Sequence, residues 1–338
     1  MQKFINKIIC GDCIELLNRT KEPFADLIFA DPPFNIGYKY DKYKDKVKQK
    51  KYIAWTKDWM STCFSVLKPN GSFYIAIGDD YAANVKVIAD ELGLFLRNWI
   101  IWHYTFGQQM KNKFARSHTH IFYFTKDKNK FTFNDDIARV ISDRQKKYKD
   151  KRANPEGKMP DDVWDEYPRV CGTFNERSDS HPCQMPESLL ARIIRVSTDK
   201  DDWILDPFSG SGTTAVVAAK LKRKYTGIEL SSEYAKESRK RIKECKDLSV
   251  EGEGPVKWTE QMDAELKWLY HENKVPTDQL SQDKYLSMLF AQKFNIRMGN
   301  KKKSYTPIKI VEHLIRLRKA GKLGALRGEP VRKNGITT

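Results

Sequence analysis

The chain of 338 residues lacks the long apolar runs that insertion into a membrane requires. Its hydrophobic stretches are too short and too interrupted to cross a bilayer as helices. The first residues, MQKFINKIICGDC, contain no extended apolar core, so we expect no secretory signal and a cytoplasmic protein. Six scattered cysteines do not form a disulfide framework, which indicates reduced thiols with structural roles.

Missing zinc-binding and dinucleotide-binding motifs, and a shortage of acidic residues, limit the reactions and partners that the sequence predicts. Cys10 and Cys13 form one C-x-x-C pair, but no second pair follows at zinc-ribbon spacing, and His118 and His120 lie far away without acidic support. No G-x-G-x-x-G turn is present, which argues against a nicotinamide oxidoreductase. Acidic residues are outnumbered, 44 against 61 Lys and Arg, and the net charge of +17 favours an anionic partner. Charge alone does not exclude a merely soluble basic protein.

Strand-like apolar segments alternate with amphipathic stretches up to about residue 245, which is typical of a Rossmann-like, doubly wound α/β sheet. These segments are residues 26–31, 71–78, 99–104, 120–124, 203–208 and 224–230. The third and fourth have no helix between them, so a hairpin is expected there and the sheet is expected to be mixed. We place this first domain at residues 1–248.

A turn-like stretch at 249–255 separates a second region with helical periodicity. Apolar residues recur at helical spacing in two segments, Trp258, Leu266, Leu269 and Tyr270, and then Ile310, Leu314, Ile315 and Leu317. The sequence therefore predicts a small helical domain over residues 256–338.

Asp31-Pro32-Pro33-Phe34 directly follows a strand-like segment, at the sheet edge where α/β proteins bind ligands. An amino group on adenine or cytosine is a poor nucleophile, because its lone pair is delocalised into the ring. The Asp31 carboxylate and the rigidly aimed Pro32 carbonyl can each accept one of its N–H bonds. Phe34 offers a flat face for an extruded base. The competing interpretation is an ordinary Asp-Pro turn after a strand.

A second turn, residues 206–214, also lies between a strand-like and a helix-like segment. Gly210 and Gly212 permit a tight turn and close approach of a ligand. No lysine follows as in a phosphate-binding loop, so a nucleoside cofactor without phosphates, such as S-adenosylmethionine, fits better. Glu229 ends the next strand 23 residues after Asp206, about where an acid binds ribose hydroxyls in dinucleotide folds, although a surface Glu is the alternative.

DPPF, FSGSGTT and this strand-end Glu resemble the β-group of DNA amino-methyltransferases, in which the catalytic motif precedes the cofactor turn. The resemblance covers about residues 7–245. It implies a class I methyltransferase fold and methyl transfer from S-adenosylmethionine to an exocyclic amino nitrogen of a flipped-out base in double-stranded DNA. The catalytic residues that it implies are Asp31, Pro32, Pro33 and Phe34.

The resemblance also implies cofactor contacts. Asp12 would bind the amino group of the cofactor's adenine, and His181–Pro186 would hold its methionine part, with Met185 at a position where the family often has lysine. The full expected set is Asp12, Cys13, His181, Gln184, Asp206, Phe208, Ser209, Gly210, Gly212, Thr213 and Glu229. His118 and His120 resemble a hairpin segment near the target base, and a structural role for both competes with this.

Sulfonium is a good leaving group, so in-line transfer is expected to need no metal and no covalent intermediate. The leading Asp of DPPF resembles adenine-N6 enzymes more than cytosine-N4 enzymes, where Ser commonly leads. We therefore expect adenine-N6 methylation, with cytosine-N4 methylation as the alternative. An RNA or protein methyltransferase and a catalytically inactive DNA-binding protein are rivals that the motif order and the intact motifs disfavour. Expected further partners are a cognate restriction endonuclease and a second copy of the chain.

Three basic stretches, residues 38–51, 108–116 and 144–158, are expected to contact DNA, each otherwise a solvated loop. By resemblance, target recognition falls at about residues 126–180. The C-terminal domain looks like a Myb-like or helix-turn-helix module, with a helical cap on the first domain as the equal alternative. The DNA-contacting residues expected are Lys39, Lys42, Lys113, Arg116, Lys146, Lys147, Lys302 and Arg316.

Overall fold

A computed structural model describes residues 4–20, 22–108, 111–148, 150, 152–167, 169–170, 183–247, 258–299, 305–324 and 326. Backbone contacts divide the chain into two compact units. The sheet unit contains Met1–Asn134 and Asp161–Gly252, and the helical unit contains Asp135–Pro160 and Glu253–Thr338. Residues 135–160 therefore fold with the C-terminal segment, whereas the sequence had placed them in the first domain.

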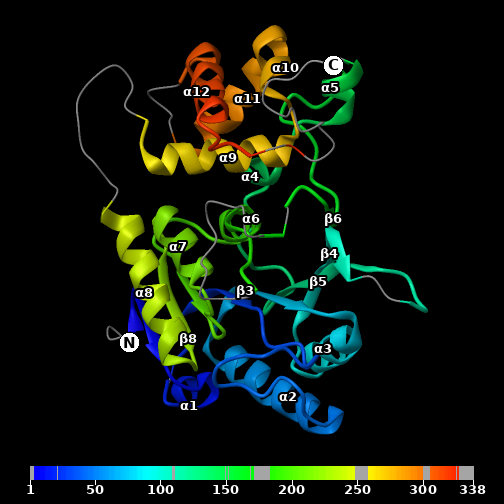
Figure 1. Ribbon diagram of the computed structural model, residues 1–338, viewed down its shortest axis with the longest axis vertical. Coiled ribbons are helices and arrows are strands. Elements are labelled where there is room, and N and C mark those ends of the chain that lie inside the picture. Colours follow the sequence, from blue (N-terminus) through cyan, green and yellow to red (C-terminus); the bar gives the residue numbers. More distant parts are fainter. Residues whose placement is uncertain are drawn as a thin grey trace. The chain divides into compact units, whose positions relative to one another are not determined.

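The described residues of the sheet unit form one eight-stranded sheet with the order β1-β8-β7-β2-β3-β5-β4-β6 (Figure 1). The strands are β1 Lys7–Cys10, β2 Ala25–Ala30, β3 Leu67–Ile77, β4 Phe95–Gln108, β5 Arg116–Thr125, β6 Val163–Trp164, β7 Trp203–Asp206 and β8 Lys224–Glu229. Strands β1, β8, β7, β2 and β3 are parallel, and β5 pairs antiparallel with both β3 and β4. The expected mixed sheet and its hairpin are confirmed; the short strands β1 and β6 were not foreseen.

Two groups of helices accompany this sheet. Helices α1 Cys13–Asn18, α2 Gln49–Val66 and α3 Asp79–Glu91 contact one another in sequence order. Helices α6 Glu187–Ser197, α7 Thr213–Lys220 and α8 Ser232–Asp247 do the same. The two groups lie on opposite faces of the strands in Figure 1, as a doubly wound fold requires.

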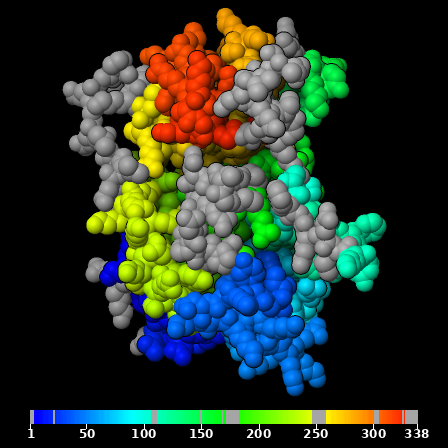
Figure 2. Space-filling view, viewed as in Figure 1, coloured from blue at the N-terminus to red at the C-terminus, as the bar shows by residue number. Residues whose placement is uncertain are grey.

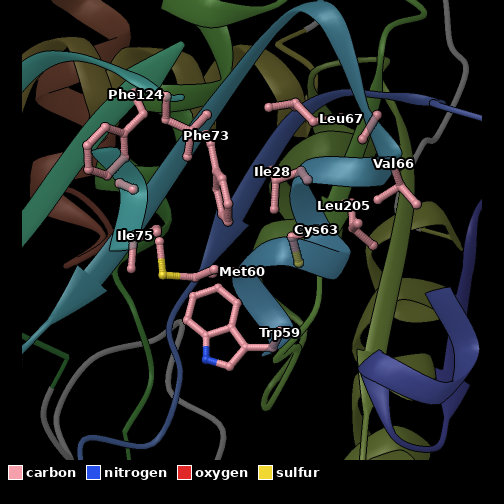
Figure 3. Packing of buried hydrophobic residues seen from close by; sticks show 14 of the residues in the cluster. Ile28, Trp59, Met60, Cys63, Val66, Leu67, Phe73, Ile75, Phe124 and Leu205 are labelled. Carbon is pink, nitrogen blue, oxygen red and sulfur yellow. The ribbon is translucent and has the colours of Figure 1, made fainter. Parts of the chain in front are cut away.

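The core between α2 and the sheet holds the functional strands in place (Figure 3). Trp59, Met60 and Cys63 of α2 pack against Ile28 of β2 and Leu205 of β7, and all five side chains are fully buried. Burial of each large side chain contributes roughly 1.5–3 kcal/mol. The carboxyl ends of β2 and β7 are therefore rigidly placed side by side.

The helical unit consists of α4 Asp135–Ala138, α5 Asp143–Tyr148, α9 Glu260–Asn273, α10 Thr277–Gln282, α11 Lys284–Arg297 and α12 Pro307–Lys319. The two expected helical segments are thus α9 and α12, and Leu266, Leu269, Ile310 and Leu314 lie in its core. No helix among the described residues of either unit is long and apolar enough to span a membrane.

Polar contacts fasten residues 135–160 to the C-terminal helices. The Asn273 side chain accepts the backbone N–H of Ile141 at 2.8 Å. The buried Lys293 amine donates to the carbonyls of Arg139, at 3.1 Å, and Glu156, at 2.7 Å. Because these polar groups are buried, any arrangement that broke their hydrogen bonds would leave them unpaired at a cost in free energy. The bonds therefore hold residues 135–160 in this one position against the C-terminal helices. The segment expected to hold target recognition is consequently shared between both units.

Candidate active site

The two sequence motifs meet in one cavity of about 740 Å³ in the sheet unit. Asp31 follows β2, Asp206 ends β7, and Leu27 and Ile28 pair with Ile204 and Leu205 in parallel register. Adjacent parallel strands end at the same sheet edge, so Asp31 and Gly210 line the same cavity. The juxtaposition expected from the sequence is present.

Glu229 is held rigidly on one side of this cavity. Its two carboxylate oxygens accept the backbone N–H groups of Gly210 and Ser231, each at 2.8 Å. A carboxylate offers about four lone-pair positions, so acceptor capacity remains for a pair of hydroxyl groups. Gly210 has a φ of 47° and Gly212 a φ of 76°, the left-handed region that favours glycine.

Gly212 is also required by space. A Cβ there would lie 2.8 Å from the Cβ of Ser238 on α8. Ser238 in turn donates its hydroxyl to the Gly210 carbonyl at 2.7 Å, which ties the turn to α8. The turn is thereby held at the cavity wall, and the hydroxyl of Ser209 is buried against Gly227 of β8.

Asp12 caps α1 and faces the same cavity. Its Oδ1 accepts the backbone N–H groups of Ile14, at 2.8 Å, and Glu15, at 3.1 Å. Its Oδ2 has no hydrogen bond with a described residue, and so is available as an acceptor. Helix capping thus orients one oxygen of this carboxylate and leaves the other for a ligand.

Two further carboxyl groups line the cavity. Burial raises the pKa of Asp31 to about 7, and the nearby charge of Asp206 adds to this while Arg169 opposes it. Burial likewise raises the pKa of Asp206 to about 7. Asp206 is anchored because its Oδ1 accepts the N–H of Phe208 at 3.0 Å. Two acids that ionise reluctantly in one cavity provide a favourable environment for a cation.

These features fit S-adenosylmethionine, which has a diol, an adenine amino group and a cationic sulfonium. The diol matches the residual acceptors of Glu229, the amino group matches the second oxygen of Asp12, and the cationic end matches Asp206 beside Asp31.

Two contacts hold the catalytic motif in place. The carbonyl of Pro33 accepts the hydroxyl of Tyr52 at 2.6 Å. The ring of Phe34 lies against Gly78, where an added Cβ would come within 3.3 Å of Cδ2. Asp31 itself makes no hydrogen bond with a described residue, which leaves its carboxylate directed to a ligand rather than to the protein.

The segment after DPPF is folded over the cavity and is more than a solvated loop. Asp45 is buried, and its carboxylate accepts the N–H groups of Asn35, Ile36 and Tyr38 at 2.6–3.3 Å. Asp41 of the same segment accepts the hydroxyl of Ser231 at 2.7 Å, directly after β8. The segment therefore reaches from β2 to β8, and its residues Tyr38, Tyr40, Lys42 and Tyr43 line the cavity.

Aromatic rings connect this segment to the cofactor turn. Tyr43 packs on Trp55 at 5.6 Å between ring centroids, and Trp55 packs on Phe208 at 5.7 Å. Phe208 also meets Trp59 edge-on at 5.2 Å. Sequence reasoning missed Tyr40, Tyr43, Trp55 and Arg169, all of which line the cavity. The spacing of tyrosines at 38, 40 and 43 was a usable signal.

The cysteine pair does not form a reactive site. Cys13 is buried, and burial raises the pKa of its thiol to about 12, so it is not a thiolate near neutral pH. Cys10 is exposed and points its thiol at the Leu230 carbonyl. The histidines differ from expectation, because Asp79 brings a carboxylate within 4.8 Å of His118 and His120. Arg116 binds that carboxylate at 3.1 Å, and Trp99 donates to His120 Nδ1 at 2.9 Å.

The other residues expected to bind the cofactor or DNA differ in burial and in their ion pairs. Gln184 and Thr213 are buried at the cavity wall. The residues expected to bind DNA that are exposed are Lys39, Lys42, Lys113, Lys147 and Arg316. Lys146 and Lys147 form ion pairs with Asp143 at 3.3 and 3.1 Å, and Lys146 also donates to the Asn273 carbonyl. His181 and Lys302 lie outside the described residues.

A doubly wound mixed sheet with a nucleoside-sized cavity at the ends of β2, β7 and β8 defines a class I methyltransferase fold. Residues 25–240 match the N6/N4 DNA methylase family, and the chain belongs to that family. The protein is therefore a DNA methyltransferase, and its methyl donor is S-adenosylmethionine.

Curated relatives and solved structures agree. The Type II methyltransferase M.HpaI of Haemophilus parainfluenzae is 36% identical over 238 residues, which is 70% of this chain and 74% of the relative. DNA adenine methyltransferase YhdJ of Escherichia coli strain K12 is 36% identical over 258 residues, 74% of this chain and 87% of the relative. The PvuII cytosine-N4-specific DNA methyltransferase shares the fold with a TM-score of 0.53 at 21% identity, over 71% of this chain and 89% of that one.

Proposed function

We propose that this chain methylates the N6 amino group of adenine in a flipped-out base of double-stranded DNA. The observation that carries the proposal is the Asp31 carboxylate, which shares a cavity with Gly210 and Glu229 and has no hydrogen bond with a described residue. The leading Asp of the motif favours adenine, and a relative of 36% identity is named a DNA adenine methyltransferase. Cytosine-N4 methylation is the second candidate, because a cytosine-N4-specific enzyme shares the fold.

Each group in the cavity has a proposed role. Asp31 accepts one N–H of the target amine and the Pro32 carbonyl accepts the other, while Phe34 stacks on the base. Glu229 and Asp12 hold the ribose and adenine of the cofactor, and Asp206 lies near its cationic end. Bound S-adenosylmethionine supplies an electrophilic methyl group on a sulfonium. Cys13, Gln184, Phe208, Ser209 and Thr213 complete the cofactor wall, with His181 proposed from the sequence alone. Gly212 acts indirectly, since it lets the turn pack closely against Ser238 of α8.

The ionised form of Asp31 is the stronger acceptor of the N–H bond, and the cation of the bound cofactor favours that state. Alignment of nitrogen, carbon and sulfur contributes several kcal/mol of the rate acceleration, in the range of about 7–11 kcal/mol known for well-oriented intramolecular reactions.

The test is to incubate the protein with unmethylated plasmid DNA and labelled cofactor, and to identify the modified nucleoside by mass spectrometry. N6-methyladenine supports the proposal, and N4-methylcytosine supports the second candidate. Asp31→Ala is expected to abolish transfer while cofactor affinity is largely retained. Asp90→Ala, which removes an exposed carboxylate on α3, is the matched control and is expected to act normally. Normal turnover by Asp31→Ala would overturn the catalytic assignment.

We further propose that the helical unit grips duplex DNA through α12. This unit has 25 Lys and Arg against 14 Asp and Glu in sequence, whereas the larger sheet unit has 36 against 30. The cations that the structure describes between residues 139 and 152 all form ion pairs; Arg144 and Arg152, for example, both bind Asp150. Lys309, Arg316 and Lys319 are exposed on one face of α12, without ion pairs among the described residues. The red atoms of α12 lie on the molecular surface in Figure 2.

Binding of labelled duplex DNA across a salt series tests this second part. Combined Lys309, Arg316 and Lys319 to Ala changes are expected to weaken binding and to reduce the slope of log affinity against log salt by about 2.7, at roughly 0.9 for each phosphate contact. Arg144, Lys147 and Arg152 to Ala changes remove paired cations and are the control. Equal slopes for both variants would favour a helical cap instead.

The exposed Lys39, Lys42, Lys113 and the cavity-lining Arg116 are proposed phosphate contacts of the sheet unit. Relatives named Type II methyltransferases support a restriction–modification role with a cognate endonuclease in the cytoplasm. Protection of plasmid DNA from cleavage tests that role. Light scattering at several concentrations tests the proposed homodimer.

A further inference from the structure

The hairpin of β4 and β5 ends in an unusually exposed aromatic residue. Phe114 is 99% exposed, and the next most exposed large hydrophobic side chain among the described residues, Tyr148, is 75% exposed. Apolar surface left in water is unfavourable, so a side chain of this size at a loop tip gains free energy when a partner covers it.

The base of this hairpin is firmly rooted in the sheet. β5 pairs with β4 from Phe95–Thr125 to Gln108–Arg116, and also with β3 up to Ile77–His120. Ile121 and Phe122 of β5 are fully buried in the sheet unit. Regular pairing of β4 with β5 reaches His103–His118, and after an irregularity the last pair is Gln108–Arg116, so residues 111–115 lie at the end of the hairpin from which Arg116 lines the cavity.

That position is next to the catalytic cavity. Arg116 lines the cavity only two residues after Phe114, and binds Asp79 at 3.1 Å and Asp80 at 3.2 Å. Both aspartates follow the end of β3, whose neighbour β2 carries the DPPF motif. Trp102, Tyr104, His118 and Thr119 of the hairpin line the same cavity. A ring two residues from the wall reaches about 7 Å along an extended chain.

The positive charge beside Phe114 indicates what kind of partner covers its ring. Lys111 and Lys113 are exposed on the same tip as Phe114, and none of the residues 111–115 is acidic. An exposed apolar ring that directly follows two exposed cations matches a duplex, in which stacked bases lie beside rows of phosphates. A base drawn into the cavity leaves a gap in that stack, opposite its former pairing partner and beside the backbone to which the flipped nucleotide stays attached.

We propose that Phe114 inserts into the duplex beside the target base pair and occupies the space that the extruded base leaves. Lys111 and Lys113 hold the flanking phosphates. Phe114 is then a positioning residue, because it acts on the DNA stack and does not touch the reacting nitrogen. This inference rests on the proposed base-flipping methyltransferase function.

The test compares Phe114→Ala with the wild-type protein on two duplexes that contain a target site mapped beforehand by sequencing of methylated plasmid DNA. In one duplex the target base is fully paired, and in the other it faces an abasic site, where extrusion is easier. Phe114→Ala is expected to lower kcat/KM by about 10- to 100-fold on the paired duplex, as loss of one stacking ring predicts. On the abasic duplex the loss is expected to be below about threefold, since little unstacking remains to be offset. Phe114→Trp is expected to restore most of the rate.

Phe95→Ala removes another exposed ring, at the far end of β4 from this tip, and is the matched control with unchanged kinetics. Fluorescence of 2-aminopurine at the target position reports extrusion directly, and its increase is expected to be smaller with Phe114→Ala. An equal loss on both duplexes, or none on the paired one, would overturn the insertion role. Failure of wild-type protein to methylate either duplex would instead overturn the proposed function.

Discussion

Asp206 is expected to destabilise the protein when no cofactor is bound, and Asp206→Asn tests this directly. The carboxyl group is 5% exposed, and burial raises its pKa from 3.8 to about 7, with the charge of Glu229 adding to the effect. The folded state therefore holds its proton more tightly than the unfolded state. By linkage, the unfolding free energy falls as pH rises from about 4 to about 7, and then stays level.

The magnitude follows from the shift. About three pKa units at 1.36 kcal/mol each give a penalty of about 4 kcal/mol at pH 8 as an upper value. Asparagine keeps the oxygen that accepts the Phe208 N–H, but its NH₂ group is imperfectly partnered at a cost of about 1–2 kcal/mol. The net gain is about 2 kcal/mol, or roughly 4–8 °C in Tm for a unit of this size. At pH 5 the ionisation penalty of Asp206 is about as small as the cost of the imperfectly partnered NH₂ group, so the two proteins are expected to be about equally stable.

Calorimetry of both proteins at pH 5 and pH 8, without cofactor, measures this difference. Asp206→Asn is expected to melt higher at pH 8 only, and to bind S-adenosylmethionine more weakly because a carboxylate near its cationic end is lost. Saturating cofactor is expected to reduce the difference in Tm between the two proteins at pH 8, because it stabilises the wild-type protein more. A variant that is no more stable at pH 8, or equally more stable at both pH values, would refute the reasoning.

Three further changes probe other parts of the chain. Asp45→Ala removes the acceptor of three backbone N–H groups, so urea unfolding should show an unfolding free energy lower by about 3 kcal/mol. The kcat/KM of this variant should fall at least tenfold, whereas Asp58→Ala, which removes an exposed carboxylate on α2, should change neither quantity. At pH 10, where the Lys293 amine is neutral in the folded state, Lys293→Met leaves two carbonyls unpaired and should lower the unfolding free energy by about 2 kcal/mol. Amide exchange in residues 135–160 should be faster, and unchanged exchange would contradict this. A thiol reagent should modify Cys10 in the native protein and Cys13 only after unfolding, and equal rates would restore the redox interpretation.

The pKa of Lys293 offers a second check on the helical unit. Burial lowers it from 10.5 to about 8, so the unfolded state binds more protons between these values. The stability of the native protein should consequently rise between pH 8 and pH 10, and Lys293→Met should remove that rise.

Elements with local signals were predictable. Alternating apolar runs located β2, β3, β4, β5, β7 and β8, and helical periodicity located α9 and α12. The strands β1 and β6 escaped because four and two residues are too few for a periodic pattern. The covering role of residues 35–47 escaped because Asp45 forms its backbone hydrogen bonds only when the chain turns back on itself.

The sequence alone determined the identity and order of the chemical groups: an Asp-Pro-Pro-Phe turn, a glycine turn and an acid at the next strand end, each beside its own strand. Those signals are local, because backbone conformation and strand edges depend on neighbouring residues. Tertiary structure alone decided that Asp31 is buried, and that its burial and the nearby charge of Asp206 raise its pKa. It also decided that residues 135–160 join helices that begin more than 100 residues later. Both outcomes depend on burial between distant segments, and the free energy of burial exists only once those segments meet.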